Sequence, residues 1–560
     1  TFQMMVFFVI FLLLGAYIVP VSGSESSAFT EGQFLYAPMW STTTYLRDSN
    51  GSLNHSWTSS FIPGAAVWWP GDGTIIRTIR DGGVDPGTGG AGGGVQKMEW
   101  DGTVAWDYRY NTGGKLSHHD VKTLPNGNVL LIAWETKTRA EAIAAGRNPN
   151  YVLSSGLLPD HVIEVKPTGP TSGEIVWAWH VWDHLIQDYN SSEENYGVVA
   201  DHPELVNINY LTDSNIDLMH TNSIDYNEEF DQIMISVHNY NEIWVIDHST
   251  TIEEAAGHTG GNSGKGGDLL YRWGNPMAYN TGTINDRKLY GPHDATWIDE
   301  GCPGEGHILL FNNGVNRPGT HYSTVDELIP PVNDNGEYYL EPGSAYGPET
   351  QTWIYTANPP TSLYSTAGCG AHRLPSGNTL ICETDSGKVF EVTPEGTTVW
   401  QYATGSQPFK VVYIPPGEPE PPQNETIPDL ECSGSLSWTD IKPGATVNGS
   451  FEVQNVGDNG SLLNWTIDTS SVSWGTWSFT PESGTNITPE DEPETVLVSV
   501  IAPDQPDSEF QGYVRVENIN DPTDFELIPV ILKTPVKIIP SLLMYLHQLL
   551  SYFFQNHPLL

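Results

Sequence analysis

Residues 389–402 read VFEVTPEGTTVWQY, and this stretch decides the fold class because its pattern recurs along the chain. A short apolar segment leads through a glycine-containing turn into a second segment that ends in Trp-x-aromatic. Residues 97–108, KMEWDGTVAWDY, repeat the pattern closely. More divergent copies contain Trp57, Trp177, Trp273 and Trp353, which gives six copies in all. A repeat of a strand pair predicts an architecture built from equivalent β-units.

The spacing of the copies fits one four-stranded unit per repeat. Trp57 and Trp106 are 49 residues apart, and Trp353 and Trp400 are 47 apart. Between the copies lies a second repeated element, Leu-Pro-x-Gly-Asn, at residues 124–128 and 374–378. Such turns between apolar segments are typical of β-hairpins. Six copies of two hairpins predict an all-β fold, a six-bladed β-propeller over residues 29–412. An irregular array of β-sandwiches is the alternative.

The region after the propeller predicts a second domain. Residues 413–428 are rich in proline and predict a stiff, extended linker. Residues 429–534 contain about seven candidate strands with alternating polarity, which favours an immunoglobulin-like β-sandwich. Residues 535–560 form an apolar tail without acidic residues, and we expect a terminal helix that packs on the protein or on another surface.

The first 28 residues indicate export. Residues 4–21 are apolar and uncharged, so residues 1–28 are interpreted as a signal peptide or an N-terminal membrane anchor, with a buried core helix as the alternative. An extracellular or cell-surface location agrees with eight Asn-x-Ser/Thr sequons, the acceptor pattern of glycoproteins. These begin at Asn50, Asn54, Asn190, Asn424, Asn448, Asn459, Asn464 and Asn486.

Charge and cysteine content exclude other classes. The chain has 68 Asp and Glu against 23 Lys and Arg, a formal net charge of −45. Because such a field repels a phosphate backbone, nucleic acid is excluded as the main partner. The four cysteines include no Cys-x-x-Cys pair, which argues against a cysteine zinc site.

Histidines stand at the predicted starts of several inner strands. His119, His220 and His293 occupy equivalent positions, so we expect all three side chains to project into the central channel. His118 precedes His119, and strand alternation predicts that it faces the opposite side. For the same reason, Asp120 and Asp294 are expected to point away from the channel and to be structural.

These motifs, taken together, resemble the bacterial PAPS-independent aryl sulfotransferases over about residues 35–412. The resemblance rests on four segments in order: residues 118–128, 220–223, 291–295 and 371–375. The family is a six-bladed propeller that moves a sulfuryl group from a phenolic sulfate ester to a phenol, in a ping-pong reaction through a sulfohistidine. No cofactor or metal is implied, and the expected partners are the sulfate donor and the phenol acceptor.

The resemblance also implies residue roles. His293 would be the nucleophile, with His119 and His220 as further catalytic residues. The sulfate would be bound by Asn222, His238 and His118. His238 stands where bacterial members carry an arginine, so it would take the place of a permanent cation.

Other functions remain open at this level. Converging histidines can hold Zn²⁺ or Cu²⁺, which would make the propeller a metal enzyme. A non-catalytic surface propeller with a binding role is a second alternative. A quinoprotein dehydrogenase-like propeller, suggested by the tryptophan repeats, is a third.

Overall fold

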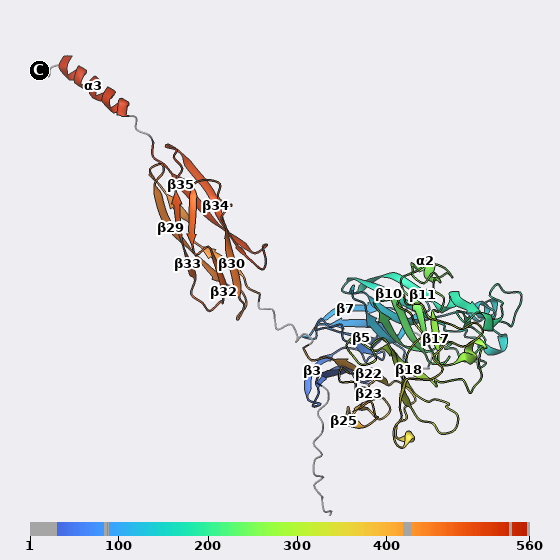
Figure 1. The fold of residues 1–560 in the computed structure, drawn as a ribbon. Helices are drawn as coiled ribbons and strands as arrows, with labels where there is room; N and C mark the ends of the chain where they lie inside the picture. The colour runs from blue at the N-terminus through green and yellow to red at the C-terminus, as the bar shows by residue number, and fades with distance from the viewer. Residues whose placement is uncertain (1–30, 83–86, 88, 418–426, 537–539, 557–560) are drawn as a thin grey trace, which may run out of the picture. The chain divides into compact units, whose positions relative to one another are not determined.

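A computed structural model describes residues 31–82, 87, 89–417, 427–536 and 540–556 (Figure 1). The chain divides into two compact units, Thr1–Pro421 and Pro422–Leu560. The described elements are almost entirely β-strands, which confirms the all-β prediction. The predicted signal peptide or anchor at residues 1–28 lies outside the described residues.

The described part of the first unit contains six four-stranded antiparallel sheets, and in each sheet the four strands are hydrogen-bonded in sequence, one to the next. The first sheet runs β26 (Val412–Ile414), β1 (Gln33–Tyr36), β2 (Thr43–Asp48) and β3 (Leu53–Thr58). The second runs β4 (Val67–Trp68), β5 (Ile75–Arg80), β6 (Gly93–Met98) and β7 (Val104–Arg109). The third runs β8 (Lys115–Thr123), β9 (Val129–Glu135), β10 (Asp160–Gly169) and β11 (Ser172–His180).

The remaining three sheets follow in chain order. The fourth is β14 (Thr221–Asn227), β15 (Gln232–Val237), β16 (Glu242–Asp247) and β17 (Tyr271–Trp273). The fifth is β18 (Pro292–Trp297), β19 (Ile308–Asn312), β20 (Thr324–Leu328) and β21 (Trp353–Tyr355). The sixth is β22 (Gly370–Arg373), β23 (Thr379–Glu383), β24 (Lys388–Val392) and β25 (Thr398–Ala403).

The two ends of this unit meet in one sheet. Strand β26 pairs antiparallel with β1, with Val412 opposite Leu35 and Ile414 opposite Gln33. This strand therefore runs two residues beyond the predicted boundary at residue 412. Because hydrogen bonds of the last strand complete the first sheet, the unit is closed by pairing between its own termini.

Each tryptophan of the repeat lies in the fourth strand of a sheet, and several bond to the next sheet. The indole of Trp57 donates to the carbonyl of Glu99 over 2.9 Å, and Trp106 donates to Ser172 over 2.9 Å. The indole of Trp353 donates to the carbonyl of Pro394 over 2.7 Å. The repeat therefore exists because a large side chain packs between sheets and its N–H satisfies a backbone carbonyl there.

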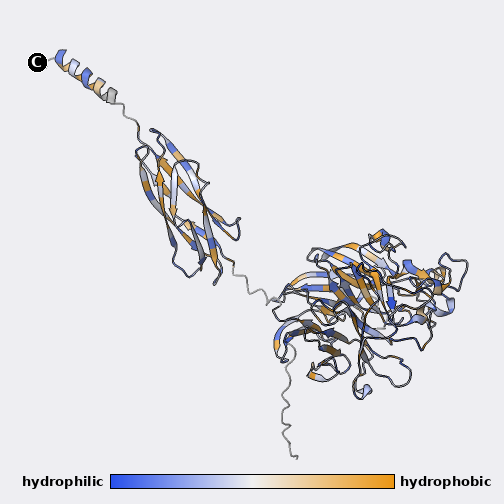
Figure 2. Cartoon of the chain, viewed as in Figure 1, coloured by the Kyte–Doolittle hydropathy of each residue, from blue (hydrophilic) through white to orange (hydrophobic). Residues whose placement is uncertain are grey.

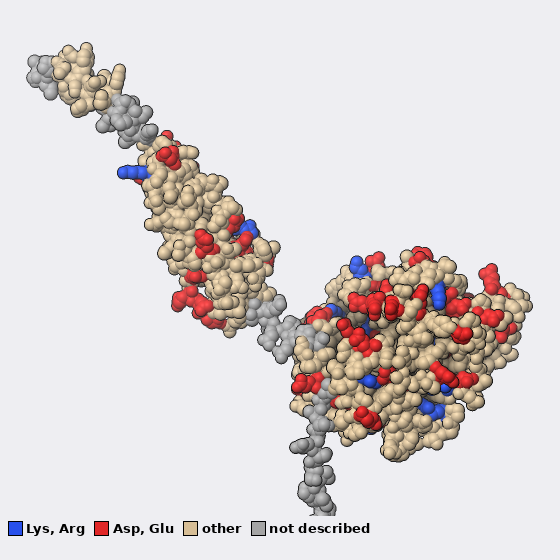
Figure 3. Space-filling view, in the orientation of Figure 1, with Lys and Arg blue, Asp and Glu red and all other residues tan. Residues whose placement is uncertain are grey.

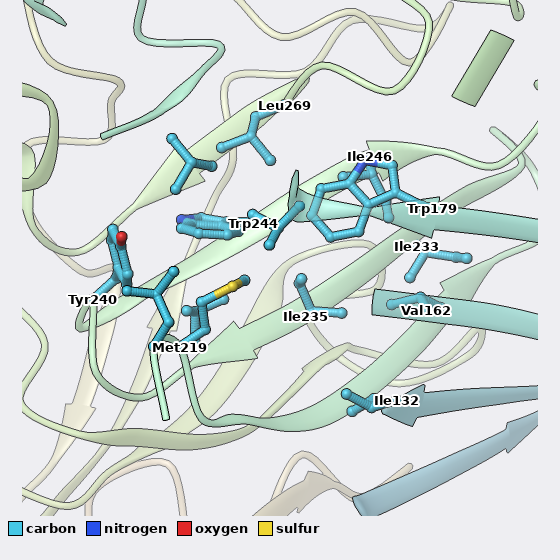
Figure 4. Packing of buried hydrophobic residues seen from close by; sticks show 14 of the residues in the cluster. Ile132, Val162, Trp179, Met219, Ile233, Ile235, Tyr240, Trp244, Ile246 and Leu269 are labelled. Carbon is cyan, nitrogen blue, oxygen red and sulfur yellow. The ribbon is translucent and has the colours of Figure 1, made fainter. Parts of the chain in front are cut away.

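Apolar side chains fill the space between neighbouring sheets, and hydrophobic residues concentrate on the strands (Figure 2). The largest cluster lies between the third and fourth sheets and includes Trp179, Trp244 and Ile235 (Figure 4). All three side chains are fully buried. Burial of each large apolar side chain contributes about 1.5–3 kcal/mol, so this interface holds the two sheets together.

Local turn chemistry agrees with the sequence. In the Leu124–Asn128 turn, the amide of Leu124 donates to the carbonyl of Asn128 over 2.9 Å. Gly127 has a φ of +81°, a value that favours glycine. In the Leu374–Asn378 turn, the amide of Leu374 likewise donates to the carbonyl of Asn378 over 2.9 Å.

Short elements join the strands. Helix α1 (Arg139–Ala144) begins at a capping box. The others are α2 (Ile252–Ala255), η1 (Pro149–Tyr151), η2 (Val181–His184), η3 (Val199–Asp201), η4 (Pro276–Tyr279), η5 (Pro360–Ser362), and the parallel pair β12 (Leu185–Ile186) and β13 (Val206–Asn207).

The second unit holds two sheets with one common apolar core. One sheet is β27 (Leu430–Ser433), β29 (Thr446–Asn455), β33 (Glu494–Ile501) and β31 (Thr476–Thr480). The other is β28 (Leu436–Trp438), β35 (Phe525–Lys533), β34 (Glu509–Asn518), β30 (Leu463–Asp468) and β32 (Ser483–Ile487). Strands such as β33 bury alternate residues, as expected of sheets with one inward face.

Helix α3 (Pro540–Asn556) follows, and its large side chains, such as Tyr545, Leu549 and Phe553, are exposed. Across the described residues, no helix has both the length and the apolar character needed to cross a membrane. Acidic side chains outnumber basic ones on the face shown in Figure 3, in keeping with the net charge.

Candidate functional site

Three histidines from three different sheets line one pocket of about 180 Å³ in the first unit. His119 lies on β8, His220 immediately precedes β14, and His293 lies on β18. Strand β14 lies beside both β8 and β18, so the starts of these first strands come together. Phe409 and Arg80 line the same pocket. The structure thus brings together the three residues predicted to be catalytic.

The imidazoles form a continuous row. The ring centroids of His119 and His220 are 4.6 Å apart. The ring centroid of His238 lies 5.2 Å from that of His220 and 5.6 Å from that of His293. His238 and the other two predicted sulfate ligands, His118 and Asn222, are not among the residues that line the pocket.

Backbone irregularities at the strand starts place neighbouring side chains in ways that simple alternation does not predict. His119 and His220 have φ values of +55° and +54°, and Asp294 has +49°. Pairing registers shift between Ser117 and Val121, and between His293 and Thr296. At the first of these bulges the Nδ1 atoms of the neighbours His118 and His119 come within 2.8 Å of each other. Both side chains are buried, but only His119 lines the pocket.

His293 carries its proton on Nδ1. The Nδ1 atom lies 2.8 Å from Oδ1 of Asn313. The Asn313 amide nitrogen donates to the carbonyls of Ser365 and Gly368, which fixes Oδ1 toward the histidine. Since Oδ1 only accepts, Nδ1 must donate and Nε2 keeps its lone pair. Burial, followed by the charge of His238, holds the pKa of His293 well below its usual value, so the ring is neutral.

The pKa of His220 shifts in the opposite direction, because this residue has a buried carboxylate partner. Its Nδ1 donates to Oδ2 of Asp217 over 2.6 Å, while Oδ1 of Asp217 accepts from the indole of Trp134 over 3.1 Å. Burial lowers the pKa of His220, but the hydrogen bond and charge of Asp217 outweigh it and raise the pKa. His220 is therefore the member of the row most suited to carry a proton.

His119 is linked to a second buried carboxylate through His118. The Nδ1 atoms of His118 and His119 lie 2.8 Å apart, and Nε2 of His118 lies 3.4 Å from Oδ1 of Asp160. His118 also stacks on Trp134, with centroids 4.0 Å apart. Burial, then the charges of the other histidines, hold the pKa of His119 well below its usual range.

The remaining two predicted sulfate ligands make internal contacts. The Asn222 amide donates to the carbonyl of Pro292, next to His293, over 2.9 Å. Nδ1 of His238 donates to Oδ1 of Asn239 over 2.9 Å. Burial, then the charge of His220, lower the pKa of His238 to about 4. A neutral ring at this position does not reproduce the permanent charge of an arginine.

A buried lysine forms ion pairs with the aspartates that follow two of the histidines. Nζ of Lys410 lies 2.7 Å from Oδ2 of Asp120 and 3.1 Å from Oδ1 of Asp294. Asp120 and Asp294 follow His119 and His293 directly, so one cation ties β8 to β18. Both aspartates are buried and face this one cation, and neither lines the histidine pocket.

Several residues of this site were not singled out from the sequence, among them Asp217, Asn313, Lys410 and Arg80. The Asp-x-x-His spacing of Asp217 and His220 was a usable local signal. Lys410 and Arg80 had none, because they come from segments far away in the chain. Arg80 is the one arginine or lysine among the described residues that line the pocket.

One comparison with known proteins identifies a family. The model of the family described as Arylsulfotransferase (ASST) matches residues 44–389. No curated protein matches the sequence. Among solved structures, a protein of unknown function from Bacteroides caccae is 12% identical over 69% of this chain and 99% of its own, with a TM-score of 0.37.

Two further solved structures show similar coverage. A putative 6-phosphogluconolactonase from Bacteroides fragilis is 12% identical over 70% of this chain and 99% of its own, with a TM-score of 0.33. Apo AztD from Citrobacter koseri is 7% identical over 69% of this chain and 98% of its own, with a TM-score of 0.32.

Proposed function

The chain belongs to the arylsulfotransferase family, which indicates aryl sulfotransferase activity in general, and from this premise we propose a specific reaction. The protein moves a sulfuryl group from a phenolic sulfate ester to a phenol, through a sulfohistidine on His293. The observation that carries the proposal is the fixed tautomer of His293, which leaves an unprotonated Nε2 in a pocket lined by two more histidines.

The proposal includes the architecture around the site. The six four-stranded sheets are the blades of a β-propeller, and the pairing of β26 with β1 closes the ring. Residues 429–534 are an immunoglobulin-like sandwich. The protein is exported to the cell surface or the medium, with residues 1–28 as signal peptide or anchor.

In the first half-reaction, Nε2 of His293 attacks sulfur and an N–S bond forms while the bond from sulfur to the phenolic oxygen breaks. A neutral imidazole is a competent nucleophile because its lone pair is available. The proton stays on Nδ1, which donates it in a hydrogen bond to Oδ1 of Asn313, so the positive charge that develops on the ring is stabilised by an oriented acceptor. Asn222 holds the Pro292 carbonyl and thereby the start of this strand.

His220 supplies the proton. Its Nε2–H protonates the departing phenolate. In the second half-reaction the neutral ring takes the proton of the acceptor phenol while the phenol oxygen attacks sulfur, so that an S–O bond forms and the N–S bond to His293 breaks. Asp217 stabilises the charged ring and fixes its tautomer, as a buried carboxylate beside a catalytic histidine does. The low pKa values of His119 and His293 keep the rest of the row neutral.

The sulfuryl oxygens need a permanent positive charge, and we assign this role to Arg80 because it lines the same pocket. We assign His119 a hydrogen bond from its ring N–H to the acceptor oxygen, with His118 orienting its ring. His238, which lies between His220 and His293, separates the charged ring from the nucleophile as a neutral spacer.

The test is to incubate the purified protein with 4-nitrophenyl sulfate, with and without phenol, and to follow nitrophenolate release and phenyl sulfate formation. We expect release that depends on the acceptor, with equal amounts of both products. His307→Ala serves as a control, because His307 pairs with Glu327 and does not line the pocket. Nitrophenolate release without transfer to phenol would indicate a hydrolase, and no turnover with any phenolic donor would favour a binding protein.

A further inference from the structure

A second cluster of metal-ligand side chains lies apart from the histidine pocket. His184 ends the short helix η2, and His258 and Asp268 stand at the two ends of the glycine-rich segment between α2 and β17. One atom from each of these residues lies within 4.8 Å of the other two. None of the three lines the histidine pocket.

The geometry is centred on one carboxylate oxygen. Oδ1 of Asp268 lies 2.8 Å from Nδ1 of His184 and 2.7 Å from Nδ1 of His258. The three atoms thus converge from two segments more than 70 residues apart in sequence. Two imidazole nitrogens and one carboxylate oxygen are a donor set that suits Zn²⁺ with a fourth position left open.

The tautomer of His184 makes this set a site for a cation. Nε2 of His184 lies 2.9 Å from the carbonyl of Ala255, which only accepts, so Nε2 carries a proton. In the neutral ring, Nδ1 then presents a lone pair toward the Asp268 carboxylate. Two lone-pair atoms facing each other need a positive charge between them. A proton can supply it, as between His220 and Asp217, and a metal ion held by the same atoms can supply it as well.

Residues next to His184 hold its ring in this orientation. Metal-binding histidines usually donate their second N–H to a carbonyl or carboxylate, and the His184 bond to Ala255 has this form. Gly267 is required for the close approach, since a Cβ there would lie 2.0 Å from the Ala255 carbonyl oxygen and 2.6 Å from Nε2 of His184. The indole of Trp179 donates to the Gly267 carbonyl over 2.7 Å and fixes the loop.

The opposite side of the cluster is open. The His258 side chain is 59% exposed, and it lines a pocket of about 380 Å³ together with Trp182, Glu194 and His202. An ion can therefore enter from solvent. Donor atoms of tetrahedral Zn²⁺ ligands lie about 3.3 Å apart, so binding requires Nδ1 of His184 and Oδ1 of Asp268 to separate by about 0.5 Å, together with a movement of the exposed His258 ring.

We propose that His184, His258 and Asp268 bind a Zn²⁺-class divalent cation, with the fourth position open to the adjacent pocket. The ion links η2 to the glycine-rich segment between the third and fourth sheets. Two of its ligands are neutral imidazoles and one is a carboxylate, so the site retains a net positive charge. Its fourth position would accept water or an oxygen of an anionic ligand.

The test is a Co²⁺ titration of chelator-treated full-length protein, followed by the visible absorption of tetrahedral cobalt and by competition with Zn²⁺. We expect one equivalent to bind. His258→Ala and Asp268→Asn should each weaken binding by at least about tenfold. His258 is exposed, so its loss leaves the fold intact, and the melting temperature without metal checks this.

Two matched controls separate this site from others. His307→Ala removes a histidine that also lies 2.7 Å from a carboxylate oxygen, and it should bind cobalt as the wild type does. His293→Ala should also retain binding, whatever its effect on transferase activity. The proposal is overturned if the wild type binds no cobalt or zinc, or if His258→Ala and Asp268→Asn bind as tightly as the wild type.

Discussion

Nδ1 of His220 donates a hydrogen bond of 2.6 Å to the buried carboxylate of Asp217, and the two residues are only three positions apart in the chain. Asp217 is thereby the residue that distinguishes His220 from the other histidines of the row. Its charge raises the pKa of His220, whereas burial and mutual repulsion lower those of His119 and His293. A row of similar side chains therefore contains one proton carrier and several neutral rings.

We predict that Asp217→Asn lowers kcat/KM for an aryl sulfate by at least about tenfold, because it weakens the proton donor. The pH profile should change as well. The protonated His220 is lost as pH rises through its pKa, and that pKa falls without the carboxylate. The high-pH decline in rate should consequently move to lower pH in Asp217→Asn. A profile that keeps the wild-type midpoint would show that His220 is not the proton donor.

His293→Ala should abolish both donor turnover and covalent labelling. Mass spectrometry of donor-treated wild-type protein should place one added sulfuryl group on the peptide that contains His293. His220→Ala should retain some activity, at a rate lower by roughly a hundredfold, since a proton donor only assists the step. Turnover that survives in His293→Ala, or a label on His119, would contradict the assignment.

Arg80→Gln should raise KM for the sulfate ester by about tenfold, the size expected for one charge-assisted hydrogen bond at a partly exposed site. The dependence of KM on salt should weaken in parallel, because a screened charge has been removed. Arg139→Gln is the control, since Arg139 bonds to backbone carbonyls of a distant loop. If KM is the same in Arg80→Gln and in the control, Arg80 does not contact the sulfate.

Lys410→Met should destabilise the first unit by about 3–5 kcal/mol, because it leaves the Asp120 and Asp294 carboxylates buried without their cation. Lys97→Met is the matched control. Lys97 pairs with Asp72 over 2.8 Å at the surface, and exposed pairs contribute only about 0–1 kcal/mol. Urea unfolding of both variants measures the difference. Equal losses would show that the buried triad adds nothing beyond a surface ion pair.

The sequence by itself determined the all-β class, the repeat and the three histidines that share a pocket. These follow from local information, since each Trp-x-aromatic strand and each Leu-Pro-x-Gly-Asn turn is specified within a few residues. His119, His220 and His293 were found because they occupy equivalent places in that repeat. Equivalent positions in a repeated unit come to equivalent positions in space.

Only the tertiary structure decided how those histidines differ. The bulge at the start of β8 brings the rings of the neighbours His118 and His119 within hydrogen-bond distance, which strict alternation does not predict. Lys410 and Arg80 reach the site from segments that are remote in sequence, so no local pattern marks them. The charge state of each ring depends on which carboxylate or amide lies against it in three dimensions. That pairing, as in His220 with Asp217 and His293 with Asn313, is set by the bends and bulges at the strand starts and by the pairing of β18 with β19.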